Sequence, residues 1–134
     1  MRRSMLLLLA LTLVAAGCDR ERDVQQDRDL AARALRGVLA YPHSTLVSLS
    51  AGNDAAELAF SSPAAVADVA QWYRLALAAN GWELKTDQVG QDGSVSMYAE
   101  KAKRPLWLTM RPNTGGPGSI YTMIGAIVEG DSIK

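Results

Sequence analysis

Residues 62–82 have the sequence SPAAVADVAQWYRLALAANGW, which carries the signals of a helix from its start to its end. Ser62 is a natural N-cap, and Pro63 suits the first helical position, where a missing N–H has no partner to lose. Apolar residues then recur at helical spacing, at Val66, Val69, Ala70, Tyr73 and Leu77. We therefore predict a helix over residues 63–80.

The end of this helix is marked by Asn80-Gly81-Trp82. Gly81 can adopt the left-handed conformation, and Trp82 then packs back on Leu77 in a Schellman arrangement. The pattern formed by Tyr73, Arg74, Leu77, Gly81 and Trp82 resembles the YRxxLxxxGW-type helix end of small envelope domains of unknown function. The resemblance implies a fold and no particular activity.

Segments with the alternation of half-buried strands lie on both sides of this helix. They are residues 45–50, 57–60, 82–88, 95–100, 106–111 and 120–128, with short turns between neighbours. Short connections favour antiparallel pairing. We predict an α+β fold in the order ββαββββ, with an antiparallel sheet of five to six strands and the main helix on one face. A short helix that begins at Leu30 after the cap Asp29, and ends at Tyr41-Pro42, precedes it.

The first 17 residues have the composition of a secretory signal. Arg2 and Arg3 are followed by an apolar run over residues 5–16, interrupted only by Thr12. A run of this length spans about 18 Å as a helix, whereas the hydrocarbon core of a membrane is about 30 Å thick. The run therefore fits the apolar region of a signal peptide better than a membrane span.

Residues 13–18, LVAAGC, resemble the lipobox of bacterial lipoproteins, although Ala15 stands where that family more often has leucine. The resemblance implies cleavage between Gly17 and Cys18 and a lipid on the Cys18 thiol, which would make the membrane a partner of the chain. A free reactive thiol is the alternative, but no activating His or CxxC partner lies nearby. Asp19 resembles a signal for retention in the inner membrane.

These features predict three parts: a signal peptide over 1–17, a lipidated N-terminus and charged tether over 18–29, and a single domain over 30–134. The 134 residues suit one domain. Loss of Arg2 and Arg3 changes the net charge from 0 to −2. Such a chain has no basic surplus for a phosphate backbone, so we do not expect nucleic acid as a partner.

Few residues suggest chemistry. His43 is the only histidine and Cys18 the only cysteine, so we expect no metal site and no cofactor. Ser44 lies next to His43, but neighbours in a turn rarely supply nucleophile and base geometry. The glycines of residues 115–118 lead into a strand, whereas phosphate loops lead into a helix. Carboxylates that converge in three dimensions remain an open alternative: Glu57, Asp87, Asp92 and Glu100.

Tyr98, Trp107 and Tyr121 are candidates for an aromatic partner surface, provided that one face of the sheet is left uncovered. The alternative is that both faces are covered and all three are core residues. Our leading hypothesis is a non-enzymatic binding or accessory module, lipid-anchored in the bacterial envelope and facing the periplasm or the exterior, whose partner is another envelope protein. The alternative is a small envelope enzyme or ligand-binding protein that uses a cleft between helix and sheet.

Overall fold

The computed structural model describes residues 16–128, which fold into one α+β domain. Residues 1–15, which hold most of the predicted signal, lie outside the described residues. The helices are α1 (Ala16–Ala34) and α2 (Val66–Ala79). The strands are β1 (Thr45–Ala51), β2 (Ala55–Ser62), β3 (Glu83–Val89), β4 (Val95–Lys101), β5 (Arg104–Pro112) and β6 (Ser119–Ala126).

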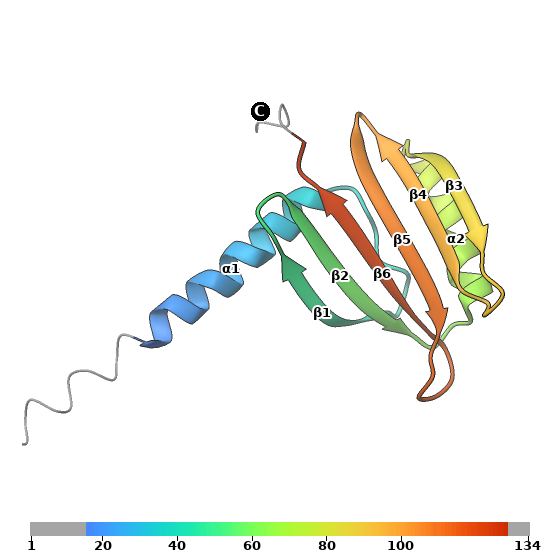
Figure 1. Cartoon of the computed structure of the whole chain (residues 1–134), viewed down its shortest axis with the longest axis horizontal. Coiled ribbons are helices and arrows are strands. Elements are labelled where there is room, and N and C mark those ends of the chain that lie inside the picture. Colours follow the sequence, from blue (N-terminus) through green and yellow to red (C-terminus); the bar gives the residue numbers. More distant parts are fainter. Residues whose placement is uncertain (1–15, 129–134) are drawn as a thin grey trace, which may run out of the picture.

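The six strands form one antiparallel sheet in the order β1-β2-β6-β5-β4-β3 (Figure 1). Consecutive strands pair as hairpins except β2 and β3, which are connected through α2. β2 pairs with β6 instead, so β6 lies between β2 and β5. The last strand is thus central, flanked by neighbours on both sides. The predicted antiparallel α+β architecture is confirmed.

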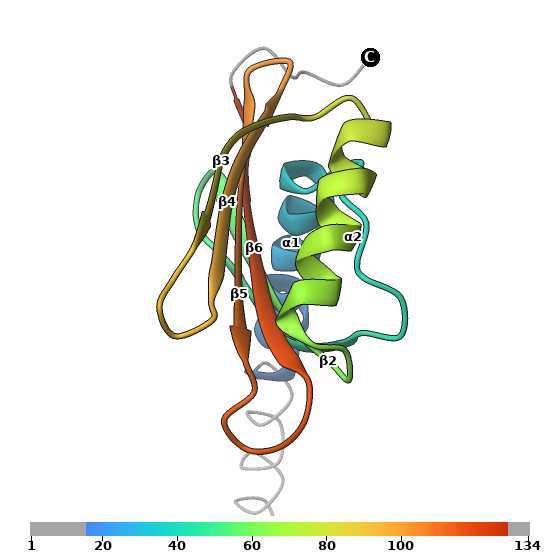
Figure 2. The ribbon, with the colours of Figure 1, turned by 90° about the vertical axis from the view of Figure 1, so that its right-hand side faces the viewer.

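Both helices lie on the same face of the sheet (Figure 2). α2 packs against β3, β4 and β5, while α1 packs against β1, β2 and β6. The sheet side chains beneath α2 alternate along each strand: Val95, Met97 and Ala99 on β4 and Leu106, Leu108 and Met110 on β5 are all buried. No described helix covers the opposite face, so this is a two-layer fold with one open sheet face.

The main helix begins later than predicted and ends as predicted. Ser62 does not cap it; its Oγ accepts a hydrogen bond from the N–H of Ala64 at 3.1 Å, in a turn that holds Pro63 outside the helix. The cap position is Ala65. At the other end, Gly81 has φ +80°, and the N–H of Trp82 donates to the carbonyl of Leu77 at 2.9 Å. The Schellman arrangement is confirmed.

The prediction of a tether followed by a helix from Leu30 is wrong, because α1 is one continuous helix through residues 16–34. Arginine, glutamine and glutamate are good helix formers, and the amide of Gln25 donates to Asp29 one turn later at 3.0 Å. The helix stops at Ala34, and Gly37 follows with φ +79°. The predicted boundary at residue 29 therefore falls inside α1, whose N-terminal half projects past the sheet (Figure 1).

The core side chains of the described residues come from residues between Leu30 and Ile127, so the first half of α1 contributes none of them. No helix among the described residues is long and apolar enough to cross a membrane.

Candidate functional site

A groove of about 300 Å³ opens between the last turns of α1, the loop after it and the helix-bearing face of β1, β2 and β6. Its described lining residues are Arg28, Ala31, Ala32, Leu35, Val38, Ala40, Leu46, Leu49, Leu58, Phe60 and Met123. Among them Arg28 alone is charged, and the rest are apolar. The volume lies at the lower end of the ~300–1,000 Å³ that is typical of small-molecule sites.

The groove exists because the two helices do not cover the sheet completely. Under α1, small residues allow a close approach: Ala56 of β2 is buried, and Gly125 of β6 lies against the carbonyl of Ala34. Farther along the same strands, Leu58 and Phe60 are only partly buried, and Leu46 of β1 is 50% exposed. Apolar sheet residues thus extend beyond the cover that either helix supplies.

The loop over residues 35–44 forms one wall of the groove and is fixed by two tyrosines from the core. The hydroxyl of Tyr73 on α2 donates to the carbonyl of Leu39 at 2.9 Å, and burial raises the pKa of this hydroxyl. The hydroxyl of Tyr121 on β6 accepts from the N–H of Tyr41 at 3.0 Å and donates to Ser44 Oγ at 2.7 Å. Hydrogen bonds from these two buried tyrosines hold the wall in place.

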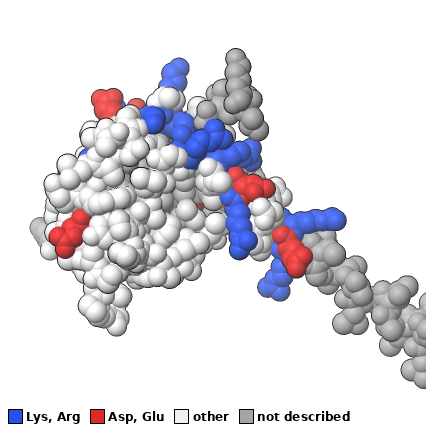
Figure 3. Space-filling view, turned by 180° about the vertical axis from the view of Figure 1, so that it is seen from behind, with Lys and Arg blue, Asp and Glu red and all other residues white. Residues whose placement is uncertain are grey.

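Positive charge gathers beside the groove. On the helix-bearing face, Lys and Arg side chains cluster at the corner of the sheet beside the end of α1, whereas acidic side chains lie among the basic ones along α1 (Figure 3). Arg104, at the start of β5, donates to the carbonyls of Arg33, Ala34 and Arg36 at 3.1–3.3 Å. This guanidinium satisfies carbonyls that the end of α1 leaves without helical partners.

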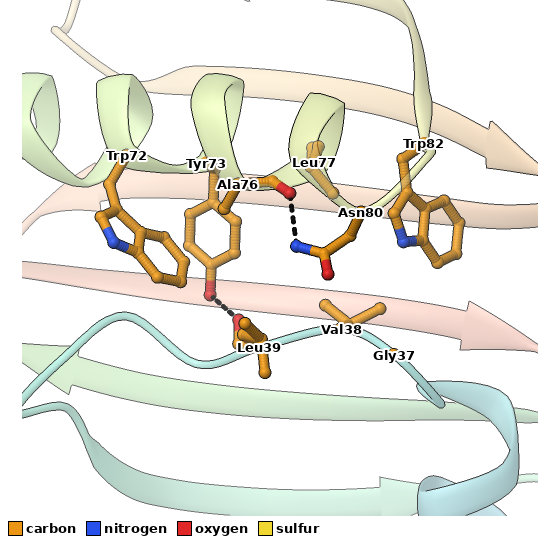
Figure 4. A pocket seen from close by; sticks show the side chains of 9 residues that line it. All are labelled: Gly37, Val38, Leu39, Trp72, Tyr73, Ala76, Leu77, Asn80 and Trp82. Atoms are coloured by element: carbon orange, nitrogen blue, oxygen red, sulfur yellow. Dashed lines mark hydrogen bonds between the residues drawn. The ribbon is translucent and has the colours of Figure 1, made fainter.

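A second crevice, between α2 and residues 37–39, is too small for a ligand. Its volume is about 10 Å³, about what a single water needs. Figure 4 shows that Tyr73 and Asn80 point across it, the first toward Leu39 and the second back to the carbonyl of Ala76.

The carboxylates named from the sequence do not converge on the groove. Hydrogen bonds from the Arg74 guanidinium, at 2.6 and 2.9 Å, lower the pKa of Asp87. The pKa of Asp92 is lowered by hydrogen bonds from Ser94 within a turn. Glu57 and Glu100 are not among the groove residues either. Within residues 16–128, no three His, Cys, Asp or Glu side chains come together as metal ligands.

The family model that matches this chain is that of START domain-like proteins, over residues 44–117, more than half of the sequence. The chain belongs to the START domain-like family. The matched segment runs from just before β1 to the loop after β5, so α1 and β6 lie outside it. The groove of this START domain-like protein therefore takes its helical wall from outside the matched segment. Comparison with curated proteins and with solved structures found no match.

Of the three predicted surface aromatics of this START domain-like protein, two lie together. Tyr98 and Trp107 are neighbours on the open sheet face, with ring centroids 5.3 Å apart, and Trp107 is 44% exposed. Tyr121 does not belong to this surface, because it is fully buried on the opposite face. Ile124 occupies the position of β6 beside Trp107. The role of Tyr98 and Trp107 in binding a partner stays a prediction.

The remaining candidates are scattered. His43 is exposed in a turn with φ 62°, while Ser44 is bound to Tyr121. Gly17 and Cys18 fall in the first turn of α1, where only the backbone is described. Sequence reasoning named a cleft between helix and sheet only as an alternative, and it did not identify the residues of the groove. Its one signal was the row of apolar residues in 30–39, which marked a packed segment without showing what it packs on.

Proposed function

We propose that this chain is a lipid-anchored protein of the bacterial envelope that binds a small apolar ligand, without catalysis, in the groove beneath α1. The observation that carries the proposal is the groove itself: ten of its eleven described lining residues are apolar. Binding sites for small molecules are concave and mostly apolar, with few polar groups that fix orientation. The groove has these properties.

The chemistry of the groove favours binding over catalysis. General acid–base work needs titratable groups placed on the substrate, with pKa values matched to the task. The two carboxylates of the described residues with lowered pKa values, Asp87 and Asp92, are explained by Arg74 and Ser94, away from the groove. The groove therefore offers apolar contact and one cation.

The anchor is proposed from the lipobox-like residues that end at Cys18. Cys18 lies in the first turn of α1, and Arg28 at the groove lies ten residues later in the same helix. At 1.5 Å per residue the two are about 15 Å apart along the helix axis. A lipid on Cys18 would keep the groove close to a membrane surface, which is a source of apolar ligands.

The test uses residues 18–134 with Cys18→Ser, exported by an ordinary cleavable signal, since the whole core lies after residue 29. The probe is 1-decanol, with affinity measured by titration calorimetry and with the methyl signal of Met123 followed by NMR. We expect binding that shifts the Met123 signal. Leu46→Gln removes an apolar contact at the groove and should weaken binding about tenfold, equivalent to ~1.4 kcal/mol.

The matched control is Val47→Gln. Val47 is the next residue in β1, is 59% exposed against 50% for Leu46, and does not line the groove. The affinity of the Val47→Gln variant for 1-decanol should equal that of the unsubstituted chain. Equal losses in the two variants, or no binding of 1-decanol to the unsubstituted chain, would overturn the proposal.

A further inference from the structure

We infer that the ligand of the groove is a single-chain amphiphile with an anionic head, whose head is bound by Arg28 and whose alkyl chain lies over Met123. This inference rests on the proposed function and names the class of its ligand. It makes Arg28 the residue that distinguishes charged from neutral ligands, because apolar contacts alone do not distinguish them.

Arg28 lies where a residue that binds the head group of the amphiphile would have to lie. It is exposed on α1, yet it belongs to the lining of the groove, where every other described residue is apolar. An arginine can lay its stem along apolar surface and hold its guanidinium in water. The guanidinium presents paired N–H donors that match the oxygens of a carboxylate or phosphate.

No described acidic residue forms an ion pair with Arg28. The ion pairs that the described residues form are Arg74 with Asp87 and Lys85 with Glu83, both remote from the groove lining. Of its neighbours in sequence, Asp29 accepts a hydrogen bond from Gln25, and neither Asp27 nor Asp29 lines the groove. Along α1 itself, Asp27 and Asp29 balance Arg28 and Arg33. The surplus of positive charge lies at the corner of the sheet beside the end of α1 (Figure 3), where it raises the local concentration of anions.

The groove also gives the ligand a direction. Met123, on the central strand β6, is 2% exposed and lines the groove from the sheet side. Arg28 is the lining residue nearest in sequence to Cys18. A chain that enters at Arg28 and ends over Met123 therefore has its head on the side of the proposed anchor. A volume of about 300 Å³ suits one alkyl chain rather than a larger ligand.

The experiment compares decanoate, decyl phosphate and 1-decanol on the chain described above, before and after Arg28→Gln. The substitution should lower the affinity for decanoate and for decyl phosphate by about tenfold, and it should change the affinity for 1-decanol by less than twofold. Arg22→Gln is the matched control, because it removes the same charge from an exposed position of α1 outside the groove. It should leave all three affinities unchanged.

The outcomes separate this inference from the proposed function. If 1-decanol binds but Arg28→Gln leaves decanoate and decyl phosphate unchanged, the groove stands and the role of Arg28 is wrong. If Arg22→Gln and Arg28→Gln cause equal losses, the effect is general electrostatics, and the assignment to Arg28 is again wrong. If none of the three probes binds, the proposed function itself fails. A larger loss for one head group than for the other supports the inference and identifies the preferred anion.

Discussion

Gly125 of β6 lies directly against the main-chain carbonyl of Ala34, at the last residue of α1. A Cβ atom at position 125 would collide with this carbonyl and with the side chain of Leu35. The missing side chain lets α1 settle on the central strand. Because Leu35 also lines the groove, this contact fixes one end of the groove wall.

We predict that Gly125→Ala destabilises the domain by about 1–3 kcal/mol, because backbone on the facing helix must move to admit a methyl group. Urea unfolding followed by circular dichroism measures the effect. Gly115→Ala is the control, since a Cβ there meets only Asn113 Oδ1 at 3.8 Å. Equal unfolding midpoints for the two variants would show that α1 does not depend on the close approach.

Tyr121→Phe should loosen the loop that walls the groove. The change removes the acceptor of the Tyr41 N–H and the donor to Ser44; Tyr121 itself has no exposed surface, and both hydrogen bonds are partly buried. An unsatisfied buried donor costs about 1–3 kcal/mol. Hydrogen exchange of the Tyr41 amide should accelerate accordingly. Tyr98→Phe deletes the same atom on the open face, where Glu100 is its partner. Faster exchange in that variant as well would argue against a local clamp.

The burial of Tyr121 also shows where sequence reasoning reached its limit. β6 is apolar on both faces, with Ile120 and Ile124 on one and Tyr121 and Met123 on the other. Its alternation therefore does not say which set faces the helices. In β4 and β5 the two sets differ clearly, and there the sequence predicts the buried face correctly.

The helices give the same lesson. The Schellman end of α2 was predictable because Gly81 and Trp82 carry local signals. The extent of α1 was not, because charged and amide residues without an apolar stripe suit a solvated tether and an exposed helix equally. The position and the residues of the groove were not predictable for a different reason. It joins residues of α1, a loop and β1, β2 and β6, and only the insertion of β6 beside β2 brings these segments together.

The ion pair between Arg74 and Asp87 should make stability depend on pH in acid. The hydrogen bonds from Arg74 lower the pKa of Asp87 in the folded protein. The pair therefore stabilises the fold above the ordinary carboxyl pKa, and this stability is lost as pH falls through the lowered pKa. Both side chains are about a third exposed, so Asp87→Asn should cost only about 0.5–1 kcal/mol at pH 7. In an Arg74→Gln background, Asp87→Asn should cost less stability. Undiminished loss in that background would exclude the pair as the cause.

The proposed anchor predicts a lipid on Cys18 and a rigid spacer beyond it. From Cys18 to Ala34, α1 spans about 25 Å, so the domain would be carried on a helix rather than on a flexible tether. Expression of the whole chain in a lipoprotein-processing bacterium should give a mature product that starts at Cys18, carries acyl mass and fractionates with membranes. Cys18→Ala should lose both the added mass and the membrane residence. Two or more acyl chains are needed for stable anchoring, so the added mass also reports how firmly the protein is held. An unmodified product, in whichever fraction it is found, would contradict the anchor and leave the groove to be judged on its binding alone.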